Sequence, residues 1–190
     1  MLNDLSIIEG EYLSDILDQP RALEETLAAL VLTKPLQQVG ARLDRGKFQR
    51  IVLTGMGSSF HALHPLNLEL IGEGFTSVMV ETSELVHYKR RFFDPATLII
   101  AVSQSGQSAE MIRLIQINRR NSAVVAVTNT PGSPLARSAD AAVLTRAGQE
   151  FSVSCKTYVS ALMALHWLGL ANPDDHVSYR CADGARTRAI

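Results

Sequence analysis

The sequence predicts one α/β domain, a doubly wound, five-stranded parallel sheet with helices on both faces. Short apolar runs rich in β-branched residues alternate with helix-length segments, which is the order that produces a parallel sheet. The runs are apolar at successive positions, as in strands that helices cover on both faces. A length of 190 residues suits one domain with a substantial core.

Helical spacing of apolar residues opens the chain, before the alternation begins. A proline at position 20 interrupts this spacing, so two helices are expected to meet at Gln19-Pro20, and a further helix at 36–43 is closed by Gly46. Strands are then predicted at 51–53, 77–80, 97–102, 123–127 and 141–144, and helices at 59–71, 83–88, 108–120, near 135 and at 157–170. We expect N-terminal helices at 1–45 that pack on the domain, a single domain at 46–171 and an irregular tail at 172–190.

Composition bounds the class of protein and its partners. The net charge is −1, which gives little support to nucleic-acid binding, because that affinity is largely electrostatic. The basic clusters at 89–91 and 119–120 are interpreted as solvated helix ends. Two cysteines make a disulfide-stapled fold unexpected, no signal-peptide pattern opens the chain, and no apolar run approaches the roughly 20 residues that span a bilayer. The expectation is a cytoplasmic protein without membrane contact.

Three loops that follow predicted strands consist mostly of Gly, Ser, Thr, Asn and Gln. They are Thr54–Ser59, Ser103–Ser108 and Thr128–Ser133. In open parallel sheets ligands bind beyond the carboxyl ends of the strands, where helices begin. Free N–H groups at a helix start attract anions, and serine hydroxyls add neutral donors. One such loop would simply cap a helix, but three at one edge predict a phosphate site.

Other phosphate motifs do not fit these loops. The first loop has Gly55 and Gly57, but Phe60 stands where a dinucleotide fingerprint needs its third glycine. Residues 40–47 are one residue too long for a P-loop, and they precede a strand instead of following one. A nucleotide-binding domain is therefore the weakest of the alternatives.

From about Tyr12 to Leu170 the chain resembles the SIS (sugar isomerase) domain family. The resemblance is greatest to the first SIS domain of glucosamine-6-phosphate synthase and of fructosamine deglycase relatives. Ser103-Gln104-Ser105-Gly106 with Ser108 is similar to the family's phosphate-binding loop, and residues 57–62 are similar to its first-strand motif. Residues 129–133 and 147–153 resemble the family's Asn-x-x-Gly-Ser turn and Ala-Gly-x-Glu segment.

This resemblance implies the site. It assigns phosphate contacts to Ser103, Gln104, Ser105 and Ser108, and sugar contacts to Ser58, Ser59 and the backbone near Val153 and Cys155. Two departures stand against it. The family often has Ser-Thr-Lys where this chain has Cys155-Lys156-Thr157, which rotates the lysine to a different face. Synthase-like members also carry the catalytic Glu and Lys in a second SIS domain, so the resemblance implies a fragment or a truncated reading frame.

No catalytic residue is predicted with certainty. Aldose–ketose isomerisation needs a base, for which Glu81, Glu84 and Glu150 are geometrically possible. Glu150 is the best of these weak candidates, although a structural role is favoured even there. His61 and His64 lack a third metal ligand at a sensible spacing, and Cys155 is expected to be a buried thiol, so neither a metal nor a cofactor is expected.

Two functions remain open at this point. The chain binds an amino-sugar, fructosamine or hexose 6-phosphate as the first half of an isomerase- or deglycase-like protein, or it is a non-catalytic module that senses a sugar phosphate. No basic helix precedes the domain, which counts against a DNA-binding regulator. Apolar helix surface around 159–170 leads us to expect a homodimer or association with a second SIS domain.

Overall fold

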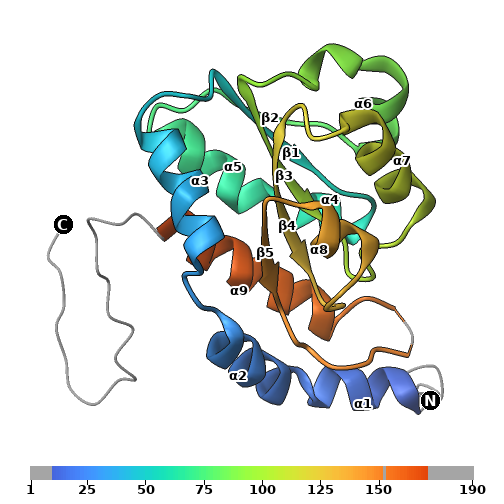
Figure 1. The fold of residues 1–190 in the computed structure, drawn as a ribbon. Helices are drawn as coiled ribbons and strands as arrows, with labels where there is room; N and C mark the ends of the chain where they lie inside the picture. Colours follow the sequence, from blue (N-terminus) through green and yellow to red (C-terminus); the bar gives the residue numbers. More distant parts are fainter. Residues whose placement is uncertain (1–9, 152, 171–190) are drawn as a thin grey trace, which may run out of the picture.

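The computed structural model describes residues 10–151 and 153–170, and Figure 1 shows their arrangement. Five parallel strands form one sheet in the order β2-β1-β3-β4-β5. Their bounds are β1 Arg50–Thr54, β2 Ser77–Met79, β3 Thr97–Val102, β4 Ala123–Thr128 and β5 Ala141–Leu144. The predicted fold class is confirmed, because this is a doubly wound sheet whose strand order reverses between β1 and β3.

Helices cover both faces of the sheet. On one face lie α3 (Lys34–Asp44), α5 (His64–Gly72) and α9 (Lys156–Leu170), and on the other lie α6 (Thr82–Tyr88), α7 (Ala109–Asn118) and α8 (Pro134–Ser138). Alternate residues of one strand reach opposite cores, so that Ile100 packs with α5 and α9 while Ile99 packs with α6 and α7. This double burial explains the unbroken apolar runs in the sequence.

The N-terminal helices pass along the edge of the domain beneath α9 (Figure 1). They are α1 (Glu11–Leu17) and α2 (Gln19–Ala29), which meet at the predicted proline, and α2 packs against α9. Ala22 and Thr26 of α2 are fully buried. The N-terminal helices are thereby joined to the last helix of the domain, more than 100 residues later in the chain.

One expectation from the sequence was wrong in detail. The predicted helix at 59–71 is two helices, α4 (Ser58–His61) and α5, because Pro65 lies in the first turn of α5, where a proline starts a helix and cannot continue one. Part of the apolar surface of α9 is covered, because α2 and α5 pack against it and Ala161, Ala164 and Leu165 are buried. Leu17 and Leu27 of the N-terminal helices are exposed apolar side chains.

Other boundaries agree closely with the predictions. A 3₁₀ turn at Arg90–Phe92 follows α6 and was not predicted. Lys89 and Arg119 end α6 and α7 as exposed cap residues, in line with solvated helix ends. Among the helices of the described part, none has the length and apolarity that crossing a membrane requires. The predicted tail at 172–190 lies outside the described residues.

Candidate phosphosugar site at the switch point

A hollow lies at the carboxyl edge of the sheet, above the point where the strand order reverses. Its volume is about 310 Å³, including the part that is open to solvent. We call it the switch-point hollow. Its lining comes from the loops after β1, β3, β4 and β5 and from the start of α9: Ser58, Ser59, Val102, Gln104, Val127, Thr128, Asn129, Thr145, Ser154, Thr157, Tyr158 and Ala161.

The loop after β3 leaves the N-terminus of α7 open. The Ser103 hydroxyl accepts the Gly106 N–H at 3.1 Å, and the Ser108 hydroxyl caps α7 by accepting the Met111 N–H at 3.3 Å. The N–H groups of Ser105, Ser108 and Ala109 donate to no acceptor among the described residues. Free N–H groups at the positive end of a helix form an anion site.

Capping and ligand binding are compatible at these serines. A hydroxyl has one donor proton and two lone pairs, so a serine that accepts a backbone N–H keeps its own proton for a ligand. Ser105 accepts only a long bond of 3.4 Å from the Gln107 N–H, and its side chain is half-buried. The loop therefore offers backbone and hydroxyl donors together without a charged side chain.

Gly106 allows this loop to pack closely against its neighbour. Its φ is +62°, and a Cβ built there would lie 2.3 Å from the Ser133 Oγ and 3.0 Å from the Thr128 Oγ1. The Gly106 carbonyl also accepts the Leu135 N–H at 3.0 Å. Only glycine fits a left-handed position with so little space, so the loops after β3 and β4 hold each other in place.

Asn129 fixes the far wall of the hollow. Its side-chain nitrogen donates to the Gly148 carbonyl at 2.7 Å, and its Oδ1 accepts the Ala147 N–H at 2.7 Å and the Thr145 hydroxyl at 3.1 Å. The loop after β4 is thus fastened to the loop after β5. The Asn129 Oδ1 is thus fully used, and the side-chain nitrogen keeps one N–H, so Asn129 shapes the hollow and can offer only a single side-chain donor to a ligand.

A carboxylate occupies the N-terminus of α9, in contrast to that of α7. Glu150 accepts the Cys155 N–H at 2.8 Å and the Thr157 N–H at 3.2 Å, both on the same oxygen, and the Thr157 hydroxyl donates to its other oxygen. The Ser154 and Thr157 hydroxyls are bonded to each other at 3.0 Å. Glu150 therefore serves as the cap of α9, the structural role that the sequence favoured for it.

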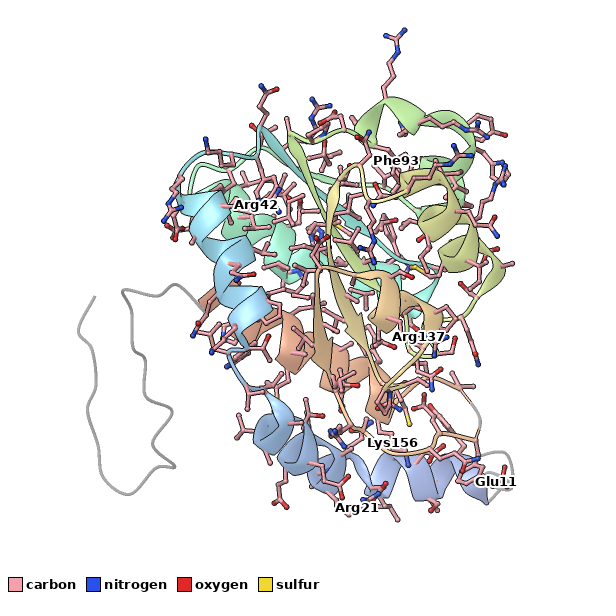
Figure 2. The ribbon with its side chains drawn as sticks, in the orientation of Figure 1. Glu11, Arg21, Arg42, Phe93, Arg137 and Lys156 are labelled. Carbon is pink, nitrogen blue, oxygen red and sulfur yellow. The ribbon has the colours of Figure 1, made fainter. Side chains whose placement is uncertain are left out.

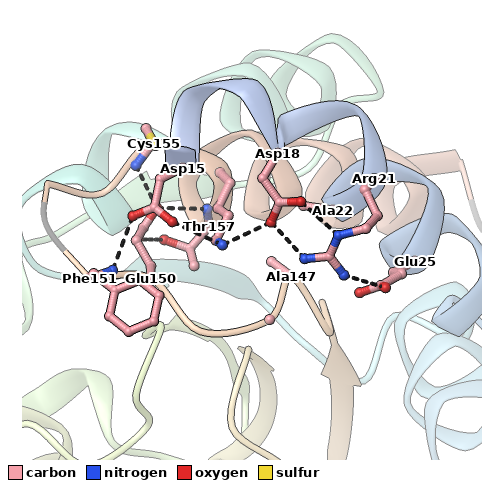
Figure 3. A network of polar contacts seen from close by, with 12 residues as sticks. Asp15, Asp18, Arg21, Ala22, Glu25, Ala147, Glu150, Phe151, Cys155 and Thr157 are labelled. Atoms are coloured by element: carbon pink, nitrogen blue, oxygen red, sulfur yellow. Dashed lines mark hydrogen bonds and ion pairs between the residues drawn. The ribbon is translucent and has the colours of Figure 1, made fainter. Parts of the chain in front are cut away.

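A chain of ion pairs continues from this helix start to the N-terminal helices (Figure 3). Lys156 Nζ lies 3.0 Å from Asp15 Oδ1 and 2.9 Å from Asp18 Oδ2, and Arg21 bridges Asp18 and Glu25 at the outer end. We call these five residues the ion-pair network. Figure 2 shows Lys156 beside the N-terminal helices, on the same side of the molecule as Arg21.

The network shifts the pKa values of its members. The hydrogen bond from the Phe151 N–H lowers the pKa of Asp15, with burial acting in the opposite direction and Lys156 adding to the decrease. Hydrogen bonds from Arg21 and then from Lys156 lower the pKa of Asp18. Burial acts to lower the pKa of Lys156, but its bonds to Asp18 and Asp15 outweigh burial and raise it. Burial also raises the pKa of the Cys155 thiol, which disfavours a reactive thiolate.

The structure brings only part of the predicted site together in the hollow. Ser58, Ser59 and Gln104 line it, whereas Ser103, Ser105 and Ser108 lie on the adjoining loop. Val153 is exposed, and the Cys155 N–H is already taken by Glu150. Sequence reasoning missed a group on the far wall, namely Thr145, Ser154, Thr157 and Tyr158. Thr145 could have been found, because it directly follows a predicted strand.

Other candidate residues lie apart from the hollow. Glu81 and Glu84 do not line it, and His61 and His64 lie exposed on two different helices. Within the described residues, one group could offer three ligands to a metal: Asp15, Glu150 and Cys155 have ligand atoms within 4.8 Å of one another. Both carboxylates already accept hydrogen bonds from the chain, so this cluster gives no reason to assign a metal.

Comparison with known proteins decides the family. The family model described as the SIS domain matches residues 47–171, about two thirds of the chain. The chain belongs to the SIS domain family. A curated relative, the isomerizing glutamine–fructose-6-phosphate aminotransferase of Pyrococcus horikoshii, is 33% identical over 160 residues, which cover 83% of this chain and 26% of the relative. The SIS chain spans about a quarter of the length of the curated relatives it matches.

Solved structures confirm the SIS fold. The C-terminal domain of glucosamine-fructose-6-phosphate aminotransferase from Francisella tularensis aligns with a TM-score of 0.74 at 22% identity, over 88% of this chain and 48% of that one. The Vibrio vulnificus NanR protein, solved in complex with ManNAc-6P, aligns with a TM-score of 0.69 at 23% identity, over 89% of this chain and 64% of that one. At these identities the likeness shows the fold alone.

Proposed function

We propose that this SIS domain binds a phosphosugar, namely an amino-sugar, fructosamine or hexose 6-phosphate, in the switch-point hollow. The observation that supports this most directly is the open N-terminus of α7. The N–H groups of Ser105, Ser108 and Ala109 are free there among the described residues, and serine hydroxyls surround them. Such a helix start attracts a phosphate without any basic side chain.

The charge distribution sets the direction in which the ligand lies. Asp15 and Glu150 lie at the α9 side of the site, and their carboxylates would repel a phosphate dianion. Ser154 and Thr157 on that side present hydroxyls, which suit the neutral hydroxyl groups of a carbohydrate. The phosphate therefore lies over the loop after β3, and the sugar extends past Ser58 and Ser59 toward α9.

The chain acts as the first half of an isomerase- or deglycase-like protein in this proposal. The relative in Pyrococcus horikoshii is named for fructose 6-phosphate, and the neighbour from Vibrio vulnificus was solved with ManNAc-6P. No Asp, Glu, His or Lys occurs among the described residues that line the hollow. Since isomerisation needs a base that reaches the sugar carbons, a second domain or subunit would have to supply it.

A sensing module is the second candidate function. The same absence of acid–base side chains from the described lining favours it, because recognition alone needs no proton transfer. The two candidates differ in turnover. In D₂O, NMR of fructose 6-phosphate would show deuterium incorporation next to the carbonyl once a second SIS domain that carries a base is added. A second SIS half with a Glu and a C-terminal Lys in the parent reading frame would favour the enzyme.

A thermal-shift titration tests phosphosugar binding. The ligands are glucosamine 6-phosphate, fructose 6-phosphate, glucose 6-phosphate and inorganic phosphate, and the first variant is Ser105→Ala. A ligand at 100 times its dissociation constant should add about 2.7 kcal/mol to the stability. Loss of one hydrogen bond to a charged phosphate should weaken binding about tenfold or more. The variant itself should lose less than about 0.5 kcal/mol, because the Ser105 hydroxyl accepts only a long bond.

Ser14→Ala serves as the matched control, because Ser14 is an exposed serine on α1. It should bind every ligand as the parent does. The proposal would be wrong if none of the four ligands stabilised the parent, or if Ser105→Ala kept the full stabilisation.

A further inference from the structure

Lys156 is a buried lysine, and the carboxylates that neutralise its charge come from the N-terminal helices. Its side chain is 5% exposed, and its ammonium group lies between Asp15 and Asp18, which belong to the N-terminal helices and their junction. A buried charge is costly unless opposite charges pair with it. The first residue of α9 therefore depends on the docking of α1 and α2.

The same contacts hold the segment that leads into α9. Asp15 uses one oxygen for Lys156 and the other to accept the Phe151 N–H at 3.0 Å. Glu150, directly before Phe151, holds the N–H groups of Cys155 and Thr157. Glu150 thus holds the start of α9 from within, and Asp15 fastens Phe151 from outside.

Two residues beside Lys156, at the start of α9, reach the hollow. Ser154 and Thr157 line it and are bonded to each other, and Lys156 lies between them in the chain. Asp15, Asp18 and Lys156 do not themselves line the hollow. Any effect of the network on the shape of the hollow should therefore act on the position of Ser154 and Thr157.

We infer that Lys156 and Asp15 are positioning residues of the phosphosugar site, and that their ion pair holds the carbohydrate side of the hollow in place. This inference rests on the proposed function. The N-terminal helices, which add no side chain to the lining, become a condition for the site to form. The phosphate side of the hollow is independent of them, because Gly106 and Ser133 hold the loop after β3 against the loop after β4.

Substitution of Lys156 should change the carbohydrate side of the hollow and leave the phosphate side unchanged. In Lys156→Met the dissociation constant of fructose 6-phosphate should rise by at least about tenfold, while that of inorganic phosphate stays within about twofold. Calorimetry measures both constants at a temperature where circular dichroism shows the variant folded. Lys47→Met, which removes an exposed lysine near the start of β1, is the control and should leave both constants unchanged.

A second variant provides rescue. In Lys156→Met/Asp15→Asn the buried carboxylate charge is removed with its partner, and the Asn oxygen can still accept the Phe151 N–H. Binding of fructose 6-phosphate should recover toward the parent value. Amide exchange followed by NMR should accelerate at Phe151, Cys155 and Thr157 in the single variant and slow again in the double variant.

The outcomes distinguish the two proposals. If the parent binds fructose 6-phosphate and Lys156→Met binds it equally well, the positioning role is wrong and the proposed function stands. If the parent binds no phosphosugar, the proposed function fails. The positioning role then falls with it, because no phosphosugar site remains to be positioned. Unchanged amide exchange in Lys156→Met would also overturn the inference. Should Lys156→Met not fold, Asp18→Asn keeps the Lys156–Asp15 pair and should show a smaller loss in the same direction.

Discussion

Two helices, α7 and α9, begin at the same edge of the sheet, and their N-termini are built in opposite ways. The start of α7 carries neutral serines and keeps N–H groups free among the described residues. The start of α9 is occupied by the Glu150 carboxylate, which accepts two backbone N–H groups and a hydroxyl. Both helices present the same partial positive charge, so the difference lies in the side chains around them.

This difference means that one edge of the sheet can carry a helix start that binds an anion beside another that holds a wall of the hollow in place. A helix start that holds its own carboxylate has little attraction left for an external anion. The open start of α7 is then the place where a phosphate gains most, and the filled start of α9 keeps a fixed wall beside it. Breaking either arrangement should produce a different defect.

Gly106→Ala should have the largest effect, because it disrupts the open helix start. The new Cβ would adopt a left-handed φ and overlap Ser133, whose Oγ lies 2.3 Å away. Left-handed strain and overpacking together should cost about 3 kcal/mol of unfolding free energy. We also expect phosphate binding to disappear. Urea unfolding and calorimetry with inorganic phosphate measure the two effects.

Gly132→Ala is the matched control for backbone strain. Gly132 also has a positive φ, +71°, but the nearest atom to its added Cβ is Arg137 Nη1 at 4.0 Å. This variant should lose only about 1 kcal/mol and should keep phosphate binding. Equal losses in the two variants would mean that strain alone acts at Gly106 and that the close contact with Ser133 is unimportant.

The sequence predicted the open helix start far better than the filled one. The Ser103–Ser108 loop lies directly after a buried strand, so local pattern and sheet topology were enough to place it. The fold followed from the same patterns, because double burial makes each strand an unbroken apolar run. The break between α4 and α5 was missed, although Pro65 is a local signal for it.

The far wall could not be predicted in the same way. Lys156 finds its partners Asp15 and Asp18 about 140 residues away, and no local pattern reveals such a pairing. The displaced lysine was expected on a different face, but only the structure shows that the N-terminal helices meet it there. Glu150 illustrates the same limit, because a carboxylate near a binding edge can be a base or a cap, and only its contacts distinguish the two.

Glu150→Ala should have the next largest effect, because it empties the start of α9. Loss of the cap and of a negative charge at a helix N-terminus should cost about 1–2 kcal/mol. The vacated N–H groups of Cys155 and Thr157 should then donate to a small external anion. Formate should therefore raise the melting temperature of Glu150→Ala more than that of the parent, as measured by differential scanning fluorimetry.

Two further variants sharpen this result. Glu150→Gln keeps one oxygen as an acceptor and should lose less stability than the alanine variant. Glu24→Ala removes an exposed glutamate of α2 and should respond to formate as the parent does. Equal stabilisation of the parent and Glu150→Ala by formate would show that Glu150 does not occupy an anion position.

The smallest expected effect is a pH dependence that originates in the ion-pair network. Asp15 and Asp18 have pKa values below the usual 3.8, so their contribution to stability is present above that value and is lost as the pH falls. Lys156 has a pKa above the usual 10.5, so its contribution is present below that value and is lost as the pH rises through the folded-state pKa. Stability from urea unfolding should therefore decrease at both ends, below about pH 4 and above about pH 10.5.

Asp18→Asn should flatten the acid limb, whereas Asp44→Asn, at an exposed aspartate of α3, should leave it unchanged. An acid limb as steep in Asp18→Asn as in the parent would mean that Asp18 does not contribute to it. The start of α9 would then owe its stability to the Glu150 cap and to the packing of α2 more than to the charges of the network.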